Sequence, residues 1–345
     1  MTEAAAIAHL LDTLDALEFI SRHLHPPRLA EFAATLGDRD VALRAVMADA
    51  AWPPQVRDQI ERATEATLRA CDGLRAADGM RQAYRALREV SRALEALYPL
   101  TGALPTLSRF FLAPGVDSEP VSPAARVGVA TGVRHVANDT GQRGGFSLYV
   151  PEDYNPARGH PLVMALHGGS GHGQLFLWSW LREVRGRGVI LVAPTAIGAT
   201  WSLMEPEVDS ANLVRILEAI AGQWHVDRTR LLLSGMSDGG TFTLLSGLDA
   251  GSPFTHLAPA AASFHPLLLA MADPRRFTGL PVYLVHGALD WMFPVSTART
   301  AQRALTAAGA QVTYREIADL SHVWPREEGA RIIDWFLGGR AASAG

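Results

Sequence analysis

The chain of 345 residues contains no lysine, so all of its 31 basic residues are arginines. A chain without lysine cannot form a pyridoxal Schiff base, supply the lysine of a P-loop or use a Ser-x-x-Lys acylation site. Cysteine is almost as scarce, since Cys71 is the only one. An intrachain disulfide and a cysteine-based zinc cluster are therefore excluded. Cys71 lies on an apolar helical stripe, where we expect a buried packing residue and not a reactive thiol.

Excess positive charge and long apolar runs are also missing. The formal net charge is -4 and no basic cluster occurs, which argues against a nucleic-acid-binding protein. No run of eighteen apolar residues is present, so we expect no membrane partner. Residues 1–20 contain four acidic residues and no basic start. They do not resemble a secretory signal, and we expect a cytoplasmic protein.

The pattern of apolar residues divides the chain into two parts. Residues 1–112 show helical periodicity without a strand pattern, and the segment 113–123, with three prolines and a glycine, is expected to be a linker. Residues 124–340 alternate short β-rich runs with helices. This alternation predicts an α/β fold with a mostly parallel eight-stranded sheet between helices. The N-terminal helices could cap an active site or pair two subunits as a homodimer, and the sequence does not choose between these roles.

The bounds of the expected elements follow from the same pattern. The expected strands are residues 126–136, 145–150, 161–166, 189–193, 230–233, 256–262, 281–286 and 311–317. The expected helices between the later strands are residues 210–224, 241–248, 296–308 and 327–337. In such a sheet the chemistry gathers at the carboxyl ends of the strands.

One pentapeptide at a strand end has the pattern of an activated serine. Gly-Met-Ser-Asp-Gly at 235–239 follows the apolar run 231–233 and precedes a predicted helix. In such a turn the serine is held in a strained backbone conformation and lifted clear of the sheet edge. Both glycines are needed because a Cβ would collide with neighbouring backbone at so sharp a turn. Ser237 is therefore the candidate nucleophile.

A serine hydroxyl needs a base, and the base needs a carboxylate that orients it. His322 follows the last predicted strand and Asp290 follows the strand before it. The chain order Ser237, Asp290, His322 is expected when acid and base follow the last two strands of such a sheet. Asp319 and Glu316 are nearby alternatives for the acid. Asp319 lies only three positions from His322 on one loop, which makes a relaxed bond to the far ring nitrogen awkward, so we favour Asp290.

An anion site should complete this constellation, because attack on a carbonyl places negative charge on its oxygen. His-Gly-Gly-Ser-Gly at 167–171 follows the strand 161–166, and a backbone without side chains can approach a ligand closely. We predict that the amides of Gly169 and Asp238 hold the oxyanion. A phosphate site is the alternative for such a loop, but neither a P-loop lysine nor a suitably placed Gly-x-Gly-x-x-Gly supports it.

Three tryptophans lie near these motifs in sequence. Trp291 directly follows the candidate acid, Trp324 lies two positions after the candidate base, and Trp201 follows the run 189–193. Flat aromatic side chains at strand ends can form the wall of an acyl or aromatic pocket. We predict that all three bind substrate, and ordinary packing is the alternative.

From about Arg126 to Leu337 the chain resembles α/β-hydrolases, especially the carboxylesterase/phospholipase-like group that includes feruloyl-esterase and polyhydroxybutyrate-depolymerase relatives. The segments that carry the resemblance are 147–151, 161–169, 235–240, 286–290 and 321–325. The resemblance implies an oxyanion amide at Gly169, and it leaves the N-terminal helices unexplained.

Motifs and resemblance together predict a serine carboxylesterase. The expected partner is a small-molecule ester, opened through an acyl-enzyme without a metal or an organic cofactor. The same triad can serve a thioesterase, an acyltransferase or a peptidase, because pocket shape sets the bond that is cleaved and the acceptor. A non-catalytic binding module is the rival class, although such a module usually shows a broken triad.

Overall fold

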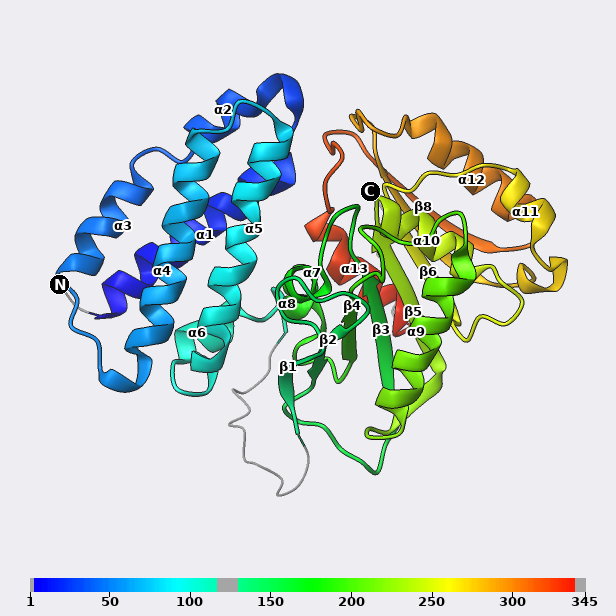
Figure 1. Cartoon of the computed structure of the whole chain (residues 1–345), viewed down its shortest axis with the longest axis horizontal. Coiled ribbons are helices and arrows are strands. Elements are labelled where there is room, and N and C mark those ends of the chain that lie inside the picture. The colour runs from blue at the N-terminus through cyan, green and yellow to red at the C-terminus, as the bar shows by residue number, and fades with distance from the viewer. Residues whose placement is uncertain (1–2, 117–129, 339–345) are drawn as a thin grey trace. The chain divides into compact units, whose positions relative to one another are not determined.

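The computed structural model describes residues 3–116 and 130–338. The chain divides into two compact units, Met1–Leu112 and Ala113–Gly345, which run from blue to cyan and from green to red in Figure 1. The division falls after Leu112, where the sequence pattern changes. The predicted linker 113–123 and the predicted strand 126–136 lie partly outside the described residues.

The first unit consists of helices whose apolar faces form its core. Leu10, Leu14 and Leu17 of the first helix are fully buried, as their helical spacing predicts. Burial raises the pKa of the Cys71 thiol to about 12, so the thiol stays protonated. The elements are α1 (Glu3–His23), η1 (Pro26–Arg28), α2 (Leu29–Ala34), α3 (Arg39–Ala48), α4 (Pro54–Arg75), α5 (Met80–Leu97), η2 (Tyr98–Gly102) and α6 (Pro105–Phe110).

The second unit is built on one eight-stranded sheet in the order β1-β2-β4-β3-β5-β6-β7-β8. β2 runs antiparallel to both β1 and β4, and the pairs from β4 to β8 are parallel. This topology confirms the predicted α/β-hydrolase fold. The strands are β1 (Gly132–Val136), β2 (Phe146–Val150), β3 (His160–Leu166), β4 (Ile190–Pro194), β5 (Val226–Met236), β6 (His256–Ala260), β7 (Pro281–Gly287) and β8 (Gln311–Ile317).

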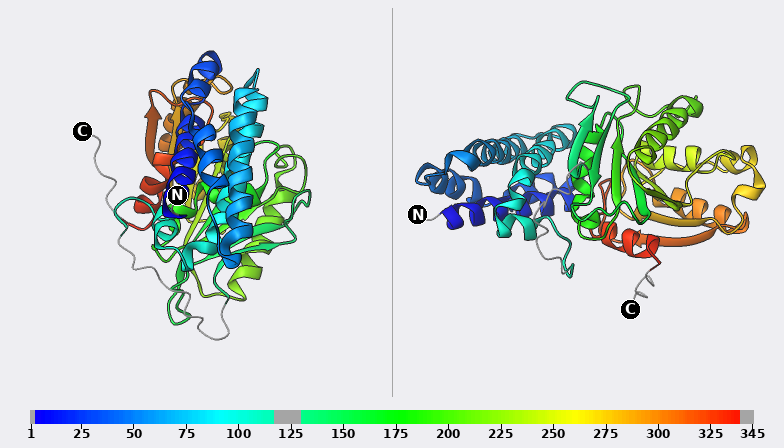
Figure 2. Two further views of the ribbon diagram at one scale, coloured as in Figure 1. Left: turned by 90° about the vertical axis from the view of Figure 1, so that its left-hand side faces the viewer. Right: turned by 90° about the horizontal axis from the view of Figure 1, so that it is seen from below.

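Helices lie on both faces of this sheet (Figure 2). β2, β3 and β4 are buried along their whole length, which explains why their sequences are mostly apolar and do not alternate with polar residues. The elements between the strands and after β8 are α7 (Gly173–Phe176), η3 (Leu177–Ser179), α8 (Leu181–Val184), α9 (Pro206–Ala221), α10 (Asp238–Gly247), α11 (Leu267–Met271), η4 (Pro274–Arg276), α12 (Val295–Ala307) and α13 (Arg326–Phe336).

Among the strands whose predicted range lies wholly within the described residues, two differ from the sequence prediction by more than one residue at an end. β5 begins at Val226, earlier than predicted, because its first half is partly exposed and carries polar residues that hide the strand pattern. β6 ends at Ala260, earlier than predicted, because Ala261 has a φ of 46° and turns the chain out of the extended conformation.

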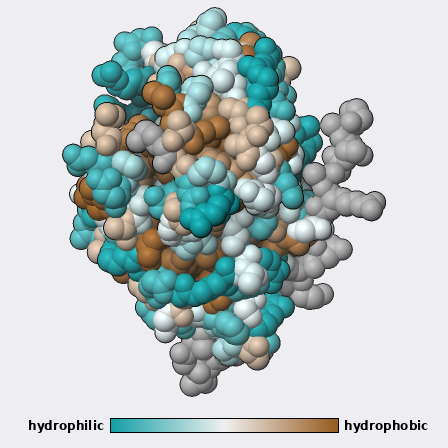
Figure 3. Space-filling model, turned by 90° about the vertical axis from the view of Figure 1, so that its right-hand side faces the viewer, coloured by the Kyte–Doolittle hydropathy of each residue, from teal (hydrophilic) through white to brown (hydrophobic). Residues whose placement is uncertain are grey.

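The carboxyl ends of the parallel strands form one edge of the sheet, where the loops after β3, β5, β7 and β8 carry the predicted motifs. On the face that carries α11 and α12, brown apolar patches alternate with teal hydrophilic bands (Figure 3). Among residues 3–116 and 130–338, no helix combines the length and the apolar character that crossing a bilayer requires.

Candidate active site

Ser237 lies at the turn between β5 and α10, and its backbone is strained. It has φ 58° and ψ -122°, a combination that residues with a side chain rarely adopt. A Cβ at Gly235 would lie 2.4 Å from the carbonyl oxygen of Gly239, and a Cβ at Gly239 would lie 2.4 Å from that of His167. The turn therefore requires both glycines. The Ser237 amide donates to the Ala260 carbonyl at 3.0 Å, which holds the turn against β6.

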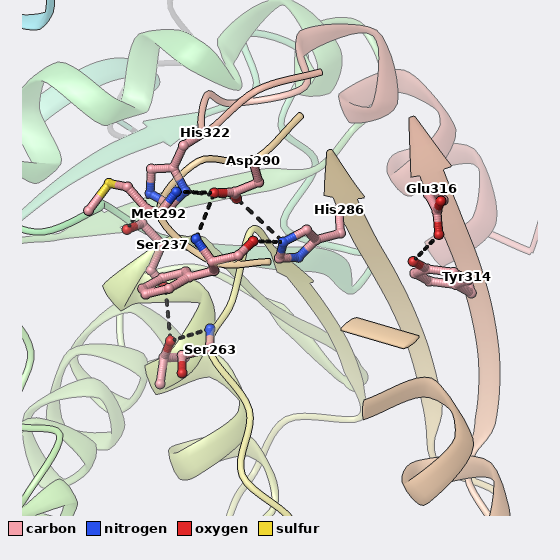
Figure 4. A network of polar contacts seen from close by, with 10 residues as sticks. Ser237, Ser263, His286, Asp290, Met292, Tyr314, Glu316 and His322 are labelled. Carbon is pink, nitrogen blue, oxygen red and sulfur yellow. Dashed lines mark hydrogen bonds and ion pairs between the residues drawn. The ribbon is translucent and has the colours of Figure 1, made fainter. Parts of the chain in front are cut away.

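The structure brings Ser237, Asp290 and His322 into one chain of hydrogen bonds (Figure 4). The Ser237 hydroxyl lies 2.9 Å from Nε2 of His322. Nδ1 of the same ring lies 2.8 Å from Oδ2 of Asp290. With the ring proton on Nδ1, the serine donates to Nε2 and the histidine donates to the carboxylate. All three side chains are buried, so water does not compete strongly for these bonds.

The Asp290 carboxylate is held as an anion by its surroundings. Burial alone would raise the pKa of Asp290, but the hydrogen bond from His322, the Phe293 amide and the nearby histidines hold the pKa below its usual value. Its Oδ1 accepts from the amides of Met292 at 2.9 Å and Phe293 at 2.8 Å. This leaves Oδ2 to face the imidazole.

The two alternative acids occupy other positions. Glu316 forms an ion pair with Arg299 at 2.6 Å and accepts from the Tyr314 hydroxyl at 2.8 Å. Asp319 is exposed on the loop that follows β8. Asp290 is therefore the carboxylate that contacts the His322 ring.

The loop after β3 runs directly beside the nucleophile. A Cβ at Gly168 would lie 3.5 Å from the Cβ of Ser237. The loop is tied to the segment after β4, because the indole of Trp201 donates to the His167 carbonyl at 2.7 Å and the Ala196 amide donates to Nε2 of His167 at 3.1 Å. These bonds fix the backbone of the loop before any substrate arrives.

The two predicted oxyanion donors lie on neighbouring segments. A Cβ at Gly169 would lie 2.7 Å from Oδ2 of Asp238, and this oxygen accepts from the Thr200 hydroxyl at 2.6 Å. In the described part of the chain, the backbone N–H groups of Gly169 and Asp238 donate to no protein acceptor. Their role as oxyanion donors stays a prediction. Sequence reasoning missed Thr200, because no motif marks a hydroxyl on the loop after β4.

The three predicted tryptophans have different surroundings. Trp201 is 2% exposed and its ring stacks on Phe242 in the core, so the predicted role as a pocket wall is corrected to support of the loop after β3. Trp324 is partly buried and packs against Trp180 at a centroid distance of 4.9 Å. Trp291 is 47% exposed and its ring lies 6.4 Å from that of His322. Of the three, Trp291 is the exposed ring beside the triad.

Replacing Gly239 by alanine should destabilise the second unit. The new Cβ would meet two backbone oxygens, those of His167 at 2.4 Å and Leu166 at 2.5 Å, and backbone cannot move away without shifting a strand. We expect a loss of about 1 to 3 kcal/mol or more in the free energy of unfolding, measured by urea denaturation. Gly222→Ala is the matched control, because its Cβ has no contact shorter than 3.4 Å and its φ is -73°. Equal stability of both variants would contradict the conclusion that the turn between β5 and α10 has no room for a Cβ at Gly239.

Fold and site together define an α/β-hydrolase with the constellation of a serine hydrolase. Residues 208–337 match the sequence profile of a family described as Phospholipase/Carboxylesterase, and this stretch contains Ser237, Asp290 and His322. This part of the chain is thus similar to carboxylesterases of that family, and the sheet topology is that of an α/β-hydrolase. No curated protein matches the chain significantly.

Several solved structures are similar to parts of the chain. A thermostable esterase is 20% identical, with a TM-score of 0.46, and the match covers 59% of this chain and 62% of that esterase, which is less than two thirds of its length. An esterase from Thermogutta terrifontis with bound butyrate is 17% identical over 62% of this chain and 97% of its own, with a TM-score of 0.49. The S-formylglutathione hydrolase FrmB from Staphylococcus aureus is 15% identical over 61% of this chain and 99% of its own, with a TM-score of 0.47.

Proposed function

We propose that the chain hydrolyses carboxylic esters through an acyl-enzyme intermediate. The observation that carries the proposal is the unbroken chain of hydrogen bonds from the Ser237 hydroxyl through His322 to Asp290, at 2.9 and 2.8 Å. A buried serine bonded to the free nitrogen of an oriented imidazole is the arrangement that raises the nucleophilicity of an alcohol. The family match over residues 208–337 supports the same chemistry.

The reaction follows from the positions of these groups. Ser237 attacks the ester carbonyl while Nε2 of His322 takes its proton, and Asp290 stabilises the imidazolium that forms. The amides of Gly169 and Asp238 bind the oxyanion, where the loss of one donor costs about 2.7 to 4 kcal/mol. His322 then gives its proton to the leaving alcohol. The same histidine activates a water molecule that releases the acid from Ser237.

A small apolar surface beside the triad supports a hydrophobic group on the substrate. Leu289, Trp291 and Met292 are 42%, 47% and 46% exposed, although apolar side chains of this size are more often buried. They flank Asp290 in sequence, and the amide of Met292 donates to Oδ1 of Asp290 at 2.9 Å. The acyl or aryl part of the ester lies against this surface. Trp324 as a further wall stays a prediction.

Replacing Trp291 by alanine should change the preferred length of the acyl chain. We expect kcat/KM for long p-nitrophenyl esters to fall by about tenfold, the effect of about 1.4 kcal/mol of lost apolar contact, while acetate is affected little. Trp201→Phe is the control, because Trp201 is buried in the core and its loss should affect esters of all lengths alike. An unchanged ratio between long and short esters in Trp291→Ala would contradict a pocket at this place.

An activity-based probe tests the proposed chemistry most directly. A fluorophosphonate should label the full chain and fail to label Ser237→Ala, since only an activated serine reacts with it. A panel of p-nitrophenyl, aryl, thioester and peptide substrates then separates an esterase from a thioesterase or a peptidase. An unlabelled wild-type protein would contradict the assignment. A cap or a homodimer built from the N-terminal helices, and a cytoplasmic location, stay predictions.

A further inference from the structure

A second histidine lies behind the acid of the triad. His286 is near the end of β7, four positions before Asp290, and both side chains are fully buried. Its Nε2 lies 2.9 Å from the carbonyl oxygen of Phe293 and 3.4 Å from Oδ2 of Asp290 (Figure 4). The mechanism proposed above uses no group of this histidine.

Phe293 connects His286 to both the acid and the base. Its amide donates to Oδ1 of Asp290 at 2.8 Å. Its ring stands edge-on to the ring of His322, at a centroid distance of 5.3 Å and an interplanar angle of 87°. A shift of the Phe293 backbone would therefore move the carboxylate and loosen the packing of the imidazole at the same time.

The direction of the hydrogen bond between His286 and the Phe293 carbonyl follows from the chemistry of the carbonyl. A carbonyl oxygen can only accept, so the proton of the neutral imidazole must be on Nε2. Among the described residues, Nδ1 has no hydrogen-bond partner. Burial lowers the pKa of His286 against the opposing effects of the Phe293 carbonyl, Asp290 and Glu316, and His322 adds to the lowering. The ring is therefore a neutral donor at neutral pH.

The loops that carry the acid and the base are also joined through backbone at this point. A Cβ at Gly287 would lie 2.2 Å from the Leu320 carbonyl oxygen, so the two loops touch directly. The Leu289 amide donates to the same carbonyl at 2.9 Å. A small displacement of His286 would therefore shift both Asp290 and His322, and through them the hydrogen bond to Ser237.

We propose that His286 is a positioning residue of the triad, which holds the 290–293 turn through the Phe293 carbonyl so that Asp290 and His322 keep their productive geometry. This inference rests on the proposed function. His286 itself touches no reacting atom. Its effect is on the alignment of the base, so its loss should lower kcat and leave substrate binding nearly unchanged.

Three substitutions of His286 separate this role from plain packing. The amide nitrogen of glutamine can reach the position of Nε2, whereas that of asparagine reaches only the position of Nδ1. Leucine fills similar space without a donor. His160→Leu is the matched control, because His160 is equally buried at the far end of β3 and donates from Nδ1 to the Gly188 carbonyl at 2.8 Å. The measurement is kcat and KM of the full chain with p-nitrophenyl butyrate.

We expect His286→Leu and His286→Asn to lower kcat on the order of 100-fold, the cost of a misplaced catalytic group, with KM changed by less than about twofold. His286→Gln should recover most of kcat. His160→Leu should lower the thermal stability and keep kcat. If His286→Leu does not fold, the comparison of glutamine with asparagine decides the question in the same way.

Two results would overturn the inference. One is a wild-type kcat in His286→Leu or His286→Asn, and the other is an equal loss in the glutamine and asparagine variants, which indicates packing alone. Labelling of the wild-type chain by a fluorophosphonate distinguishes a failure of the role of His286 from a failure of the proposed function. A labelled wild type with unaffected variants overturns only the role of His286. A wild type that neither binds the probe nor opens the ester overturns the proposed function and this inference together.

Discussion

Replacing Ser237 by alanine is expected to lower kcat for ester hydrolysis by roughly a millionfold, because triad members act as a unit and the loss of one removes the whole contribution. The alanine variant keeps the oxyanion amides and the binding surface, so a small residual rate above that of water should persist. Stopped-flow kinetics with p-nitrophenyl esters should also show that the burst of product from acylation disappears in this variant.

Ser234→Ala is the matched control for this experiment. Ser234 lies on β5, the strand that leads to Ser237. It is fully buried and donates from its hydroxyl to the Ala258 carbonyl at 2.7 Å. Its loss should cost about 1 kcal/mol of stability and leave kcat near that of the wild type. A Ser237→Ala variant whose kcat stays within about tenfold of the wild type would contradict the covalent mechanism.

Replacing Asp290 by asparagine is expected to lower kcat by about four orders of magnitude with little change in KM. The carboxylate accepts the Nδ1 proton of His322 at 2.8 Å, and it keeps the Nε2 lone pair directed at Ser237. An amide that presents its N–H₂ group to Nδ1 favours the opposite tautomer, in which Nε2 carries the proton and cannot act as a base. The asparagine side chain is nearly isosteric, so the fold should be kept.

Asp319→Asn provides the comparison for Asp290→Asn. Asp319 is exposed on the loop that carries His322, and it was the nearest alternative for the acid in the sequence. We expect its kcat to stay within about twofold of the wild type, as is usual for a surface substitution away from the reacting groups. An equal loss in both variants would show that orientation of the base is shared between two carboxylates.

Local patterns explain why much of this site could be predicted from the sequence. The strained turn at Ser237 needs glycines at fixed positions, because only they leave room for the backbone of the neighbouring loop. His322 and Asp290 could be found because parallel strands deliver their following loops to one edge of the sheet. The alternation of strands and helices likewise predicted the sheet, although polar residues hid the first half of β5 and an αL residue ended β6 early.

Contacts between distant segments could not be predicted in this way. Trp201 follows a strand end just as Trp291 does, yet its indole turns inward to the His167 carbonyl. The link from His286 to Phe293 uses a backbone carbonyl, which every residue carries and no motif marks. Such contacts depend on the three-dimensional path of the chain.

By itself, the sequence determined the α/β class and the strained serine turn, and it predicted the order of nucleophile, acid and base, because these depend on local periodicity and on glycines without side chains. Only the tertiary structure decided which carboxylate faces the imidazole and which tryptophan is exposed. It also decided that His286 contacts the Phe293 carbonyl. These choices depend on distances between residues that are far apart in the chain, and packing of the whole sheet sets those distances.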